Sequence, residues 1–277
     1  LGSAYNSLGQ HDKAVEKHGE ALKICKALGD REGEGVQKSD LGRAHRGLGQ
    51  FKEAIQAQQE ALAISRELGD REGEASRLSA LGDAYDGAGR HKNAVACHWA
   101  ALSISRERGD RQAEGRDMSN LGNALQGLGH CEATQMKTVG IGGSTWKVKL
   151  GDSTYDLALR AHEAALAVSQ ETGADPRVMQ EDLIHVANAW HGLDHHERAI
   201  ELGREALSLS RETGDRRAEC HNLIDLGAIG QSLGNRLLEK AEGRAREDTG
   251  ALSGMCRPVV VKQDGPCFGQ KVGQRAE

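Results

Sequence analysis

The chain has 277 residues, a formal net charge of -5 from 36 basic and 41 acidic residues, and only 3% aromatic residues. This small acidic excess argues against a nucleic-acid or anionic-membrane binder, because such proteins usually carry a basic excess or a basic stripe. No run of 18 apolar residues predicts a transmembrane helix. Abundant Ala, Leu, Glu, Arg and Gln and scarce strand formers favour helix over sheet.

From the N-terminus onward, one block of sequence recurs every 40 residues. It reads LGSAYNSLGQ from Leu1, LGRAHRGLGQ from Leu41, LGDAYDGAGR from Leu81 and LGNALQGLGH from Leu121. Degraded fifth and sixth copies begin at Val186 and Leu226. A second block of the KAVEKHGEALKI type follows the first three copies, and a GDRxxE block starts at Gly29, Gly69, Gly109 and Gly214. A period of this length predicts a stacked repeat architecture.

Each unit is predicted to form two helices, because apolar and small residues fall at helical spacing within both blocks. Glycines follow the helices where a left-handed residue is wanted, and Asp30, Asp70 and Asp110 suit the N-cap of the next helix. Small residues at shared positions should let the helices approach closely. They are Gly2, Gly42, Gly82 and Gly122 on first helices, and Ala14, Ala54, Ala94, Ala158 and Ala199 on second helices.

Two stretches break the pattern. The second-helix alanine expected at residue 134 appears at Ala158, so residues 131–154 form an insertion, which is Gly-rich and then alternating. It is a functional loop, a small hairpin or a translated intron, and we favour a disordered or poorly packed insert. The tail, residues 249–277, is predicted to be disordered. Residues 236–247 should form a second helix of unit 6 that caps the array. Units 1 to 4 then occupy residues 1–130, including the first helix of unit 4, and residues 155–248 complete unit 4 and units 5 and 6.

The order of Leu-Gly, an aromatic residue, Ala and then Ala-Leu resembles the tetratricopeptide repeat, with Leu41, Gly42, Tyr5, Ala14 and Ala21 at signature positions. The 40-residue period and the LGNAY-like and GDR-like blocks are similar to the repeat domain of the LGN/Pins group of G-protein-signalling modulators. The resemblance covers roughly residues 1–130 and 154–235, and the usual proline near the end of each unit is missing. It implies an all-α, right-handed superhelical solenoid of about six helix–turn–helix repeats.

In the tetratricopeptide family, the residues two and five after the signature leucine face a concave groove that binds a peptide. These positions, with the residue five before the leucine, differ between units while the packing residues repeat; the alternative is drift at solvated positions. Unit 2 is basic here and unit 3 is acidic, which predicts a partner segment of mixed charge with acidic residues over units 2 and 4. The candidate groove residues are Arg43, Arg46, Asp83, Asp86, Arg116, Asn123, Gln126 and Asn188.

The candidate chemistry is weak elsewhere in the chain. His18, His98 and His162 share one repeat position, which predicts a packing role in separate layers. His191, His195 and His196 cluster at a turn, but no Cys or carboxylate set completes a metal site. The GIGGST stretch lacks the spacing of a phosphate loop. We therefore expect no enzyme activity, no cofactor, no bound metal and no small-molecule substrate.

The sequence is thus interpreted as a scaffold or adaptor that binds a segment of another protein, without nucleic acid or membrane insertion. Two alternatives remain: a kinesin-light-chain-like cargo adaptor, and the sensor region of a larger signalling or catalytic chain. The chain opens at Leu1 rather than Met, which indicates a fragment or a processed product. Six cysteines without a CxxC spacing predict free thiols in a reducing compartment, and hence a cytoplasmic location.

Overall fold

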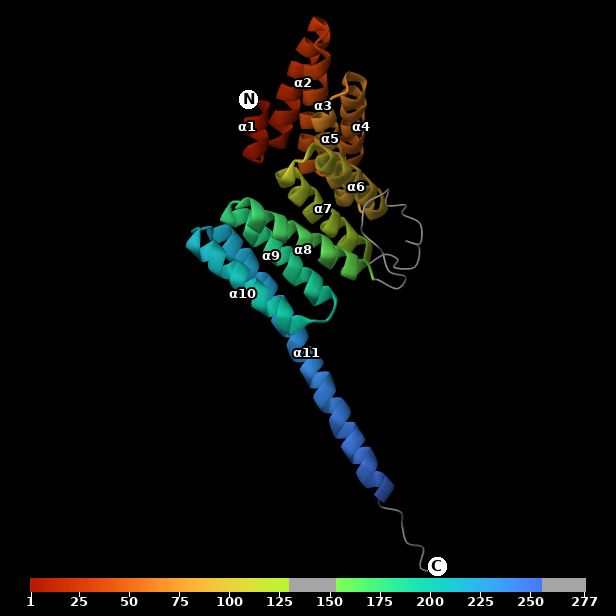
Figure 1. The fold of residues 1–277 in the computed structure, drawn as a ribbon, viewed down its shortest axis with the longest axis vertical. Helices are drawn as coiled ribbons and strands as arrows, with labels where there is room; N and C mark the ends of the chain where they lie inside the picture. The colour runs from red at the N-terminus through yellow and green to blue at the C-terminus, as the bar shows by residue number, and fades with distance from the viewer. Residues whose placement is uncertain (130–152, 256–277) are drawn as a thin grey trace, which may run out of the picture. The chain divides into compact units, whose positions relative to one another are not determined.

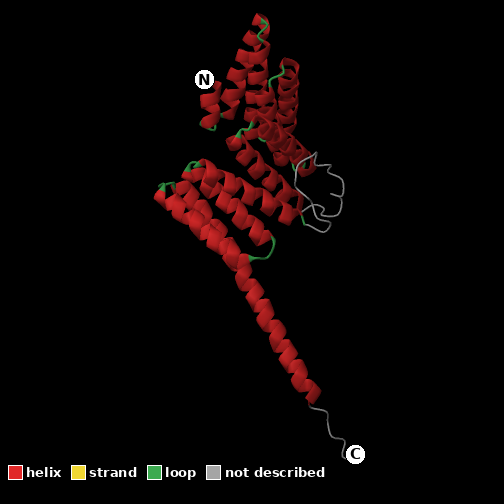
Figure 2. Cartoon of the chain, in the orientation of Figure 1, coloured by secondary structure: helices red, strands yellow, loops and turns green. Residues whose placement is uncertain are grey.

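The computed structural model describes residues 1–129 and 153–255, and these residues form helices joined by short turns, without a strand among them (Figures 1 and 2). Side chains are described as far as residue 238. The predicted insertion at 131–154 lies outside the described residues apart from Ser153 and Thr154, and the predicted tail lies outside them from residue 256. None of the described helices is long and apolar enough to cross a membrane.

The helices alternate between a first and a second helix in each unit, as the repeat predicts. First helices are α1 (Gly2–Ser7), α3 (Arg31–Gly47), α5 (Arg71–Gly87), α7 (Arg111–Gly129) and α9 (Pro176–Gly192). Second helices are α2 (His11–Leu28), α4 (Phe51–Leu68), α6 (His91–Arg108), α8 (Thr154–Thr172) and α10 (His196–Glu212), and α11 (Arg216–Met255) closes the series. The all-α solenoid expected from the sequence is therefore confirmed.

The GDR block forms the junction between one unit and the next. Gly69 ends α4 with a φ of +67°, in the left-handed region where glycine has no steric cost. Asp70 then caps α5, because its Oδ1 accepts a hydrogen bond from the Gly73 amide at 2.8 Å. Arg71 joins Glu107, near the end of α6 in the same unit, at 2.6 Å. The same ion pair recurs, 40 residues earlier, as Arg31 with Glu67. The motif therefore ends one helix, caps the next helix and provides an ion pair between the two helices of a unit.

The core of each unit depends on small residues at fixed positions. The five second-helix alanines that the repeat predicts to pack closely are all fully buried. On the first helices, Gly82 faces the ring of His98, and a β-carbon on the glycine would come within 2.5 Å of the ring atom Cε1. His18 and His162 lie against Gly2 and Gly122 in the same way, with Gln58 against Gly42. The prediction that these histidines serve packing is confirmed.

The first helices make the layer that carries the candidate site. Consecutive first helices contact one another along the stack, from α1 and α3 through to α7 and α9. Among the described residues, second helices pack mainly on the first helices before and after them rather than on each other. The first helices are therefore the closer-packed, inner layer, where side chains from neighbouring units converge.

The last helix differs from the sequence prediction. We expected a separate second helix over residues 236–247, but α11 runs without interruption from Arg216 to Met255. The register explains the difference: Glu239 and Arg246, 13 and 20 residues after Leu226, fall where other units carry alanine. A helix with these side chains cannot approach α11 closely, so a turn gains no packing and helix propensity prevails. The repeats lie in one compact unit, residues 1–232, and residues 233–277 form a second.

Candidate functional site

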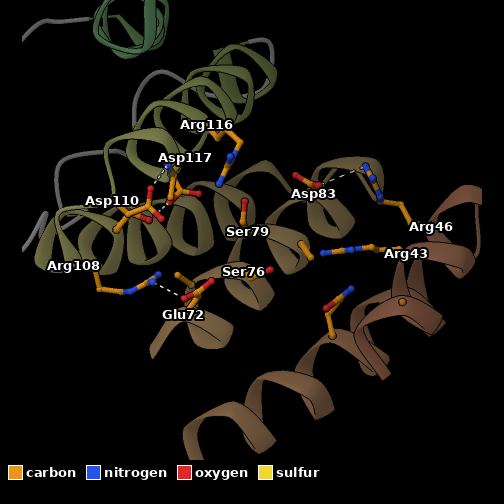
Figure 3. A pocket seen from close by; sticks show the side chains of 16 residues that line it. Arg43, Arg46, Glu72, Ser76, Ser79, Asp83, Arg108, Asp110, Arg116 and Asp117 are labelled. Atoms are coloured by element: carbon orange, nitrogen blue, oxygen red, sulfur yellow. Dashed lines mark hydrogen bonds and ion pairs between the residues drawn. The ribbon is translucent and has the colours of Figure 1, made fainter. Parts of the chain in front are cut away.

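The inner layer contains a polar hollow of about 290 Å³ between three consecutive first helices, which we call the arginine hollow. Figure 3 shows Arg43 and Arg46 entering it from α3 and Arg116 entering from α7, with Ser76 and Ser79 of α5 between them. Small side chains on α5 leave room at the floor, while the long side chains come from the units on either side. The full arginine set is Arg43, Arg46, Arg108 and Arg116.

The four arginines are neutralised to different extents. Arg108 pairs with Glu72 at 2.6 Å, Arg43 lies 3.5 Å from Asp40, and Arg46 lies 3.7 Å from Asp83. Arg116 is exposed and makes no ion pair within residues 1–129 and 153–238. Arg43 and Arg46 are about half exposed, so their charges remain available to a ligand. The hollow therefore offers positive charge mainly on its α3 and α7 walls.

A buried carboxyl group lies beneath this surface. Asp117 is only 5% exposed and accepts a hydrogen bond from Ser105 Oγ at 2.6 Å. Burial raises the pKa of Asp117 to about 6, partly offset by hydrogen bonds from Ser105 and Ser79 and by the nearby charge of Arg116. Asp117 links α5, α6 and α7, and it holds the floor of the arginine hollow in place.

A second, more open hollow of about 540 Å³ shares Arg46 and Asp83 with the first, and we call it the aspartate hollow. Burial raises the pKa of both Asp83 and Asp86, and Arg46 beside Asp83 and His91 beside Asp86 act in the opposite direction. The His91 ring nitrogen Nδ1 lies 2.9 Å from Asp86 Oδ1. The remaining walls are formed by Phe51, Gly87, His98, Asn120 and Asn123.

His98 forms the base of the aspartate hollow. Its side chain is 1% exposed, and burial lowers its pKa to about 4, so the ring is neutral at pH 7. Its Nε2 lies 3.9 Å from Asp83 Oδ1 and 4.0 Å from Asp86 Oδ2, which is beyond hydrogen-bond range. Its Nδ1 also has no hydrogen-bond partner among the described residues. The two carboxylate oxygens thus converge on a ring that satisfies neither of them.

The structure brings together most of the predicted groove residues. Arg43, Arg46 and Arg116 line the arginine hollow, and Asp83, Asp86 and Asn123 line the aspartate hollow. Arg116 and Asn123, which share a face of α7, belong to different hollows. Gln126 of α7 and Asn188 of α9 line neither hollow and are half-buried. The pair between Arg46 and Asp83 also means that the basic unit 2 and the acidic unit 3 partly neutralise each other.

One repeat position was not singled out from the sequence. It lies four residues before the signature leucine. Its occupants in units 2 to 6 are Gln37, Arg77, Asp117, Asp182 and Asn222. Asp117, Asp182 and Asn222 are buried, and Asp182 accepts a hydrogen bond from Ser169 at 2.5 Å as Asp117 does from Ser105. The sequence did carry a signal, because this repeat position is polar in each of units 2 to 6. Polar residues are seldom retained in a buried position without a hydrogen-bond partner.

The histidine cluster in unit 5 has a local structural role. Nδ1 of His191 lies 2.9 Å from Nδ1 of His196, and the ring of His195 packs edge-on against Trp190. In residues 1–129 and 153–238, no group of three or more His, Cys, Asp or Glu side chains is arranged to hold a metal ion. The three free cysteines in this part of the chain, Cys25, Cys97 and Cys220, form no disulfide.

Two sequence families match parts of the chain. The tetratricopeptide repeat family matches residues 1–67 and 37–107, and the family of anaphase-promoting complex subunit 5 matches residues 153–226. No curated protein matches the chain. Residues 1–107 therefore carry tetratricopeptide repeats, and the helical pairs of the remaining units continue the same architecture.

Solved structures with similar folds include BtubC (BKLC) from P. vanneervenii, with 17% identity, a TM-score of 0.63, and coverage of 94% of this chain and 99% of that chain. A putative kinesin light chain with nearly identical TPR-like repeats from Podosopora anserina has 18% identity, a TM-score of 0.58, and coverage of 77% and 93%. A Rap protein complexed with competence and sporulation factor has 13% identity, a TM-score of 0.64, and coverage of 90% and 66%. These similarities establish the fold alone.

Proposed function

We propose that this tetratricopeptide repeat protein binds an extended segment of a partner protein across the two hollows of its inner layer. The observation that carries the proposal is the convergence of Arg43 and Arg116, from units 2 and 4, above the serines of unit 3. Side chains from three consecutive units line one hollow, and they differ between the units, whereas the packing residues repeat from unit to unit. A partner that spans units 2 to 4 would contact all of these side chains at once.

The charges define the chemistry of the partner segment. Arg116 has no ion pair among the described residues, and Arg43 has only a long contact with Asp40. A partner carboxylate could accept charge-assisted hydrogen bonds from both guanidinium groups, which are stronger than bonds between neutral groups. We therefore expect a segment of mixed charge whose acidic residues lie over units 2 and 4. Because the arginines are half exposed, binding should weaken as salt increases.

Two narrower parts of the proposal rest on the sequence. Membership in a group similar to LGN/Pins is supported by the 40-residue period and by Arg116 and Asn123, seven residues apart on α7. A cytoplasmic location is supported by the thiol pattern, in which six cysteines show no CxxC spacing. Neither narrower proposal is needed for the binding experiment.

The test is a selection from a random dodecapeptide phage library with the full chain as bait. Selected peptides are then measured by fluorescence polarisation against wild type, an Arg43→Glu, Arg46→Glu, Arg116→Glu variant, and a control. The control, Arg90→Glu with Arg177→Glu and Arg204→Glu, makes the same charge change at exposed residues outside both hollows. We expect acidic peptides whose affinity falls at least about tenfold with the first variant and stays near wild type with the control. Failure to select any peptide, or equal losses with both variants, would refute the proposal.

A further inference from the structure

We propose that the aspartate hollow is a subsite for one arginine side chain of the partner segment, held between Asp83 and Asp86. This inference rests on the proposed function and adds a specific requirement to it: an arginine in the segment, adjacent to the acidic residue bound in the arginine hollow. The argument uses the positions of the two carboxylates, the state of His98 and the acceptors on α7.

The two carboxylates present oxygens toward a common point. Asp83 Oδ1 and Asp86 Oδ2 both lie too far from His98 Nε2 to bond to it, at 3.9 and 4.0 Å. The other oxygens are engaged elsewhere, since Asp86 Oδ1 contacts His91 and Asp83 Oδ2 contacts Arg46 at 3.7 Å. A planar guanidinium with donors on separate nitrogens can bridge two such oxygens.

Among the described residues, the hollow holds two carboxyl groups and one arginine, Arg46, which lies 3.7 Å from Asp83. Neutral His98 supplies no charge at its base, and the raised pKa of Asp83 and of Asp86 shows that burial is incompletely compensated at both carboxyl groups. The buried His98 ring makes no hydrogen bond within the described residues, although it lines the hollow. His18 and His162 also have ring nitrogens unpartnered in the described part of the chain, but the Nε2 of His98 faces two carboxylates that line a hollow, where a ligand can supply the missing partners.

The opposite wall supplies acceptors and an aromatic face. Asn120 Nδ2 donates to Ser79 Oγ at 3.2 Å, which leaves its amide oxygen as an acceptor. Asn123 lies one turn further along α7 and also lines the hollow, as does Phe51 at the start of α4. Two carboxylates, two amide oxygens and an aromatic ring match the five donors and the flat face of a guanidinium better than the point charge of a lysine.

The experiment removes the charge of the subsite and the charge of its ligand in turn. Each selected peptide is synthesised with arginine and with citrulline, the uncharged isostere, and measured against wild type and an Asp83→Asn, Asp86→Asn variant. An Asp12→Asn, Glu53→Gln chain is the control, because it removes two exposed carboxylates outside the hollows. We expect citrulline to weaken binding to wild type and to the control at least about tenfold, and to the hollow variant less than about threefold. Circular dichroism checks that the variant remains helical.

The outcomes separate this inference from the proposed function. Peptides that depend on Arg43 and Arg116 but lack arginine, or whose citrulline loss is the same in all three proteins, would overturn the subsite and leave the function intact. If no peptide is selected, the subsite is tested by titrating the full chain with N-acetylarginine amide and N-acetylcitrulline amide. Shifts of the His98 ring and of the Asn120 and Asn123 amide signals with the arginine compound alone support the subsite, and their absence refutes it.

Discussion

The β-position of Gly82 points directly at the imidazole of His98, with 2.5 Å separating the place of a β-carbon from Cε1 of the ring. The ring cannot move aside, because it is 99% buried within the unit. The corresponding glycine of α11, Gly227, has no atom within 4 Å of such a β-carbon. One repeat position therefore provides both a crowded and an open site for the same substitution.

We expect Gly82→Ala to lower the free energy of unfolding by about 1–3 kcal/mol, because the added methyl group overpacks the core. Gly227→Ala should leave stability unchanged or raise it by up to about 1 kcal/mol, since alanine is the better helix former. Urea denaturation followed by circular dichroism measures both changes. Equal effects of the two substitutions would contradict the close packing seen at His98.

The turn of unit 5 contains a residue under conformational strain. Asp194 has a φ of +63°, whereas Gly9, Gly49 and Gly89 stand at the corresponding turns of units 1 to 3. Asp194→Gly should raise the free energy of unfolding by about 1 kcal/mol, because glycine adopts this conformation without steric cost. Asp194→Asn, which keeps a β-carbon, should gain much less. A thermal melt of the three proteins tests the order, and a glycine variant below wild type would show that contacts of the Asp194 side chain outweigh the strain.

Stability should also depend on pH through His162. Burial, and secondarily the charge of His185, lowers its pKa to about 3, against about 6.5 in the unfolded chain. Below pH 6.5 the unfolded chain therefore binds a proton that the folded chain does not, and stability falls as pH falls from 6.5 toward 3. Gln58 takes the same position in unit 2 and bonds to the Ser39 carbonyl at 2.8 Å. His162→Gln should flatten the pH dependence by about 1.4 kcal/mol per unit below pH 6; parallel curves would contradict this.

Asp117 should produce the opposite pH dependence. Its folded pKa of about 6 lies above its ordinary value, so the folded chain holds a proton that the unfolded chain has lost, and stability falls as pH rises from about 4 to 6. Asn in its place can still accept the Ser105 hydrogen bond without a buried charge. We expect Asp117→Asn to be more stable than wild type at pH 7, by at most about 3 kcal/mol, and similar at pH 4. Urea titrations at both pH values decide, with Asp12→Asn as the exposed control.

Much of this architecture was predictable because the repeat displays it several times. Each close contact, such as Gly82 with His98, recurs in other units, so periodicity alone identifies packing residues. Several of the side chains that line the two hollows occupy repeat positions at which the residues change between units, and the sequence singled out those positions as a candidate groove. Periodicity also located the second helix of unit 4 at Ala158, beyond the insertion, and that alanine is fully buried.

The remaining features depend on contacts between different repeat positions, and comparing one position across the units does not reveal such contacts. Arg116 and Asn123 lie in different hollows because they are about two turns apart along α7, although units 2 to 4 line both hollows. The ion pair between Arg46 and Asp83, at 3.7 Å, joins two different repeat positions in consecutive units. The continuous α11 is consistent with the sequence, in which Glu239 and Arg246 stand at the two positions where the second helices of other units carry alanine. The role of Asp117 was missed because an acidic residue on a helix is usually solvated.

The recurrence of the junction contacts has a consequence for how such an array changes its length. Asp117 meets Ser105, Arg106 meets Glu114 and Arg66 meets Glu74, and Ser65 occupies in unit 2 the place of Ser105 in unit 3. A chain from which residues 71–110 were deleted would bring Asp117 to Ser65 and Glu114 to Arg66, and would recreate both contacts at the new junction. Unequal exchange between the repeated segments of the gene can therefore remove or add a whole unit and still keep these contacts at the boundary between units. The span available to a partner is thus a quantity that evolution can adjust in steps of 40 residues.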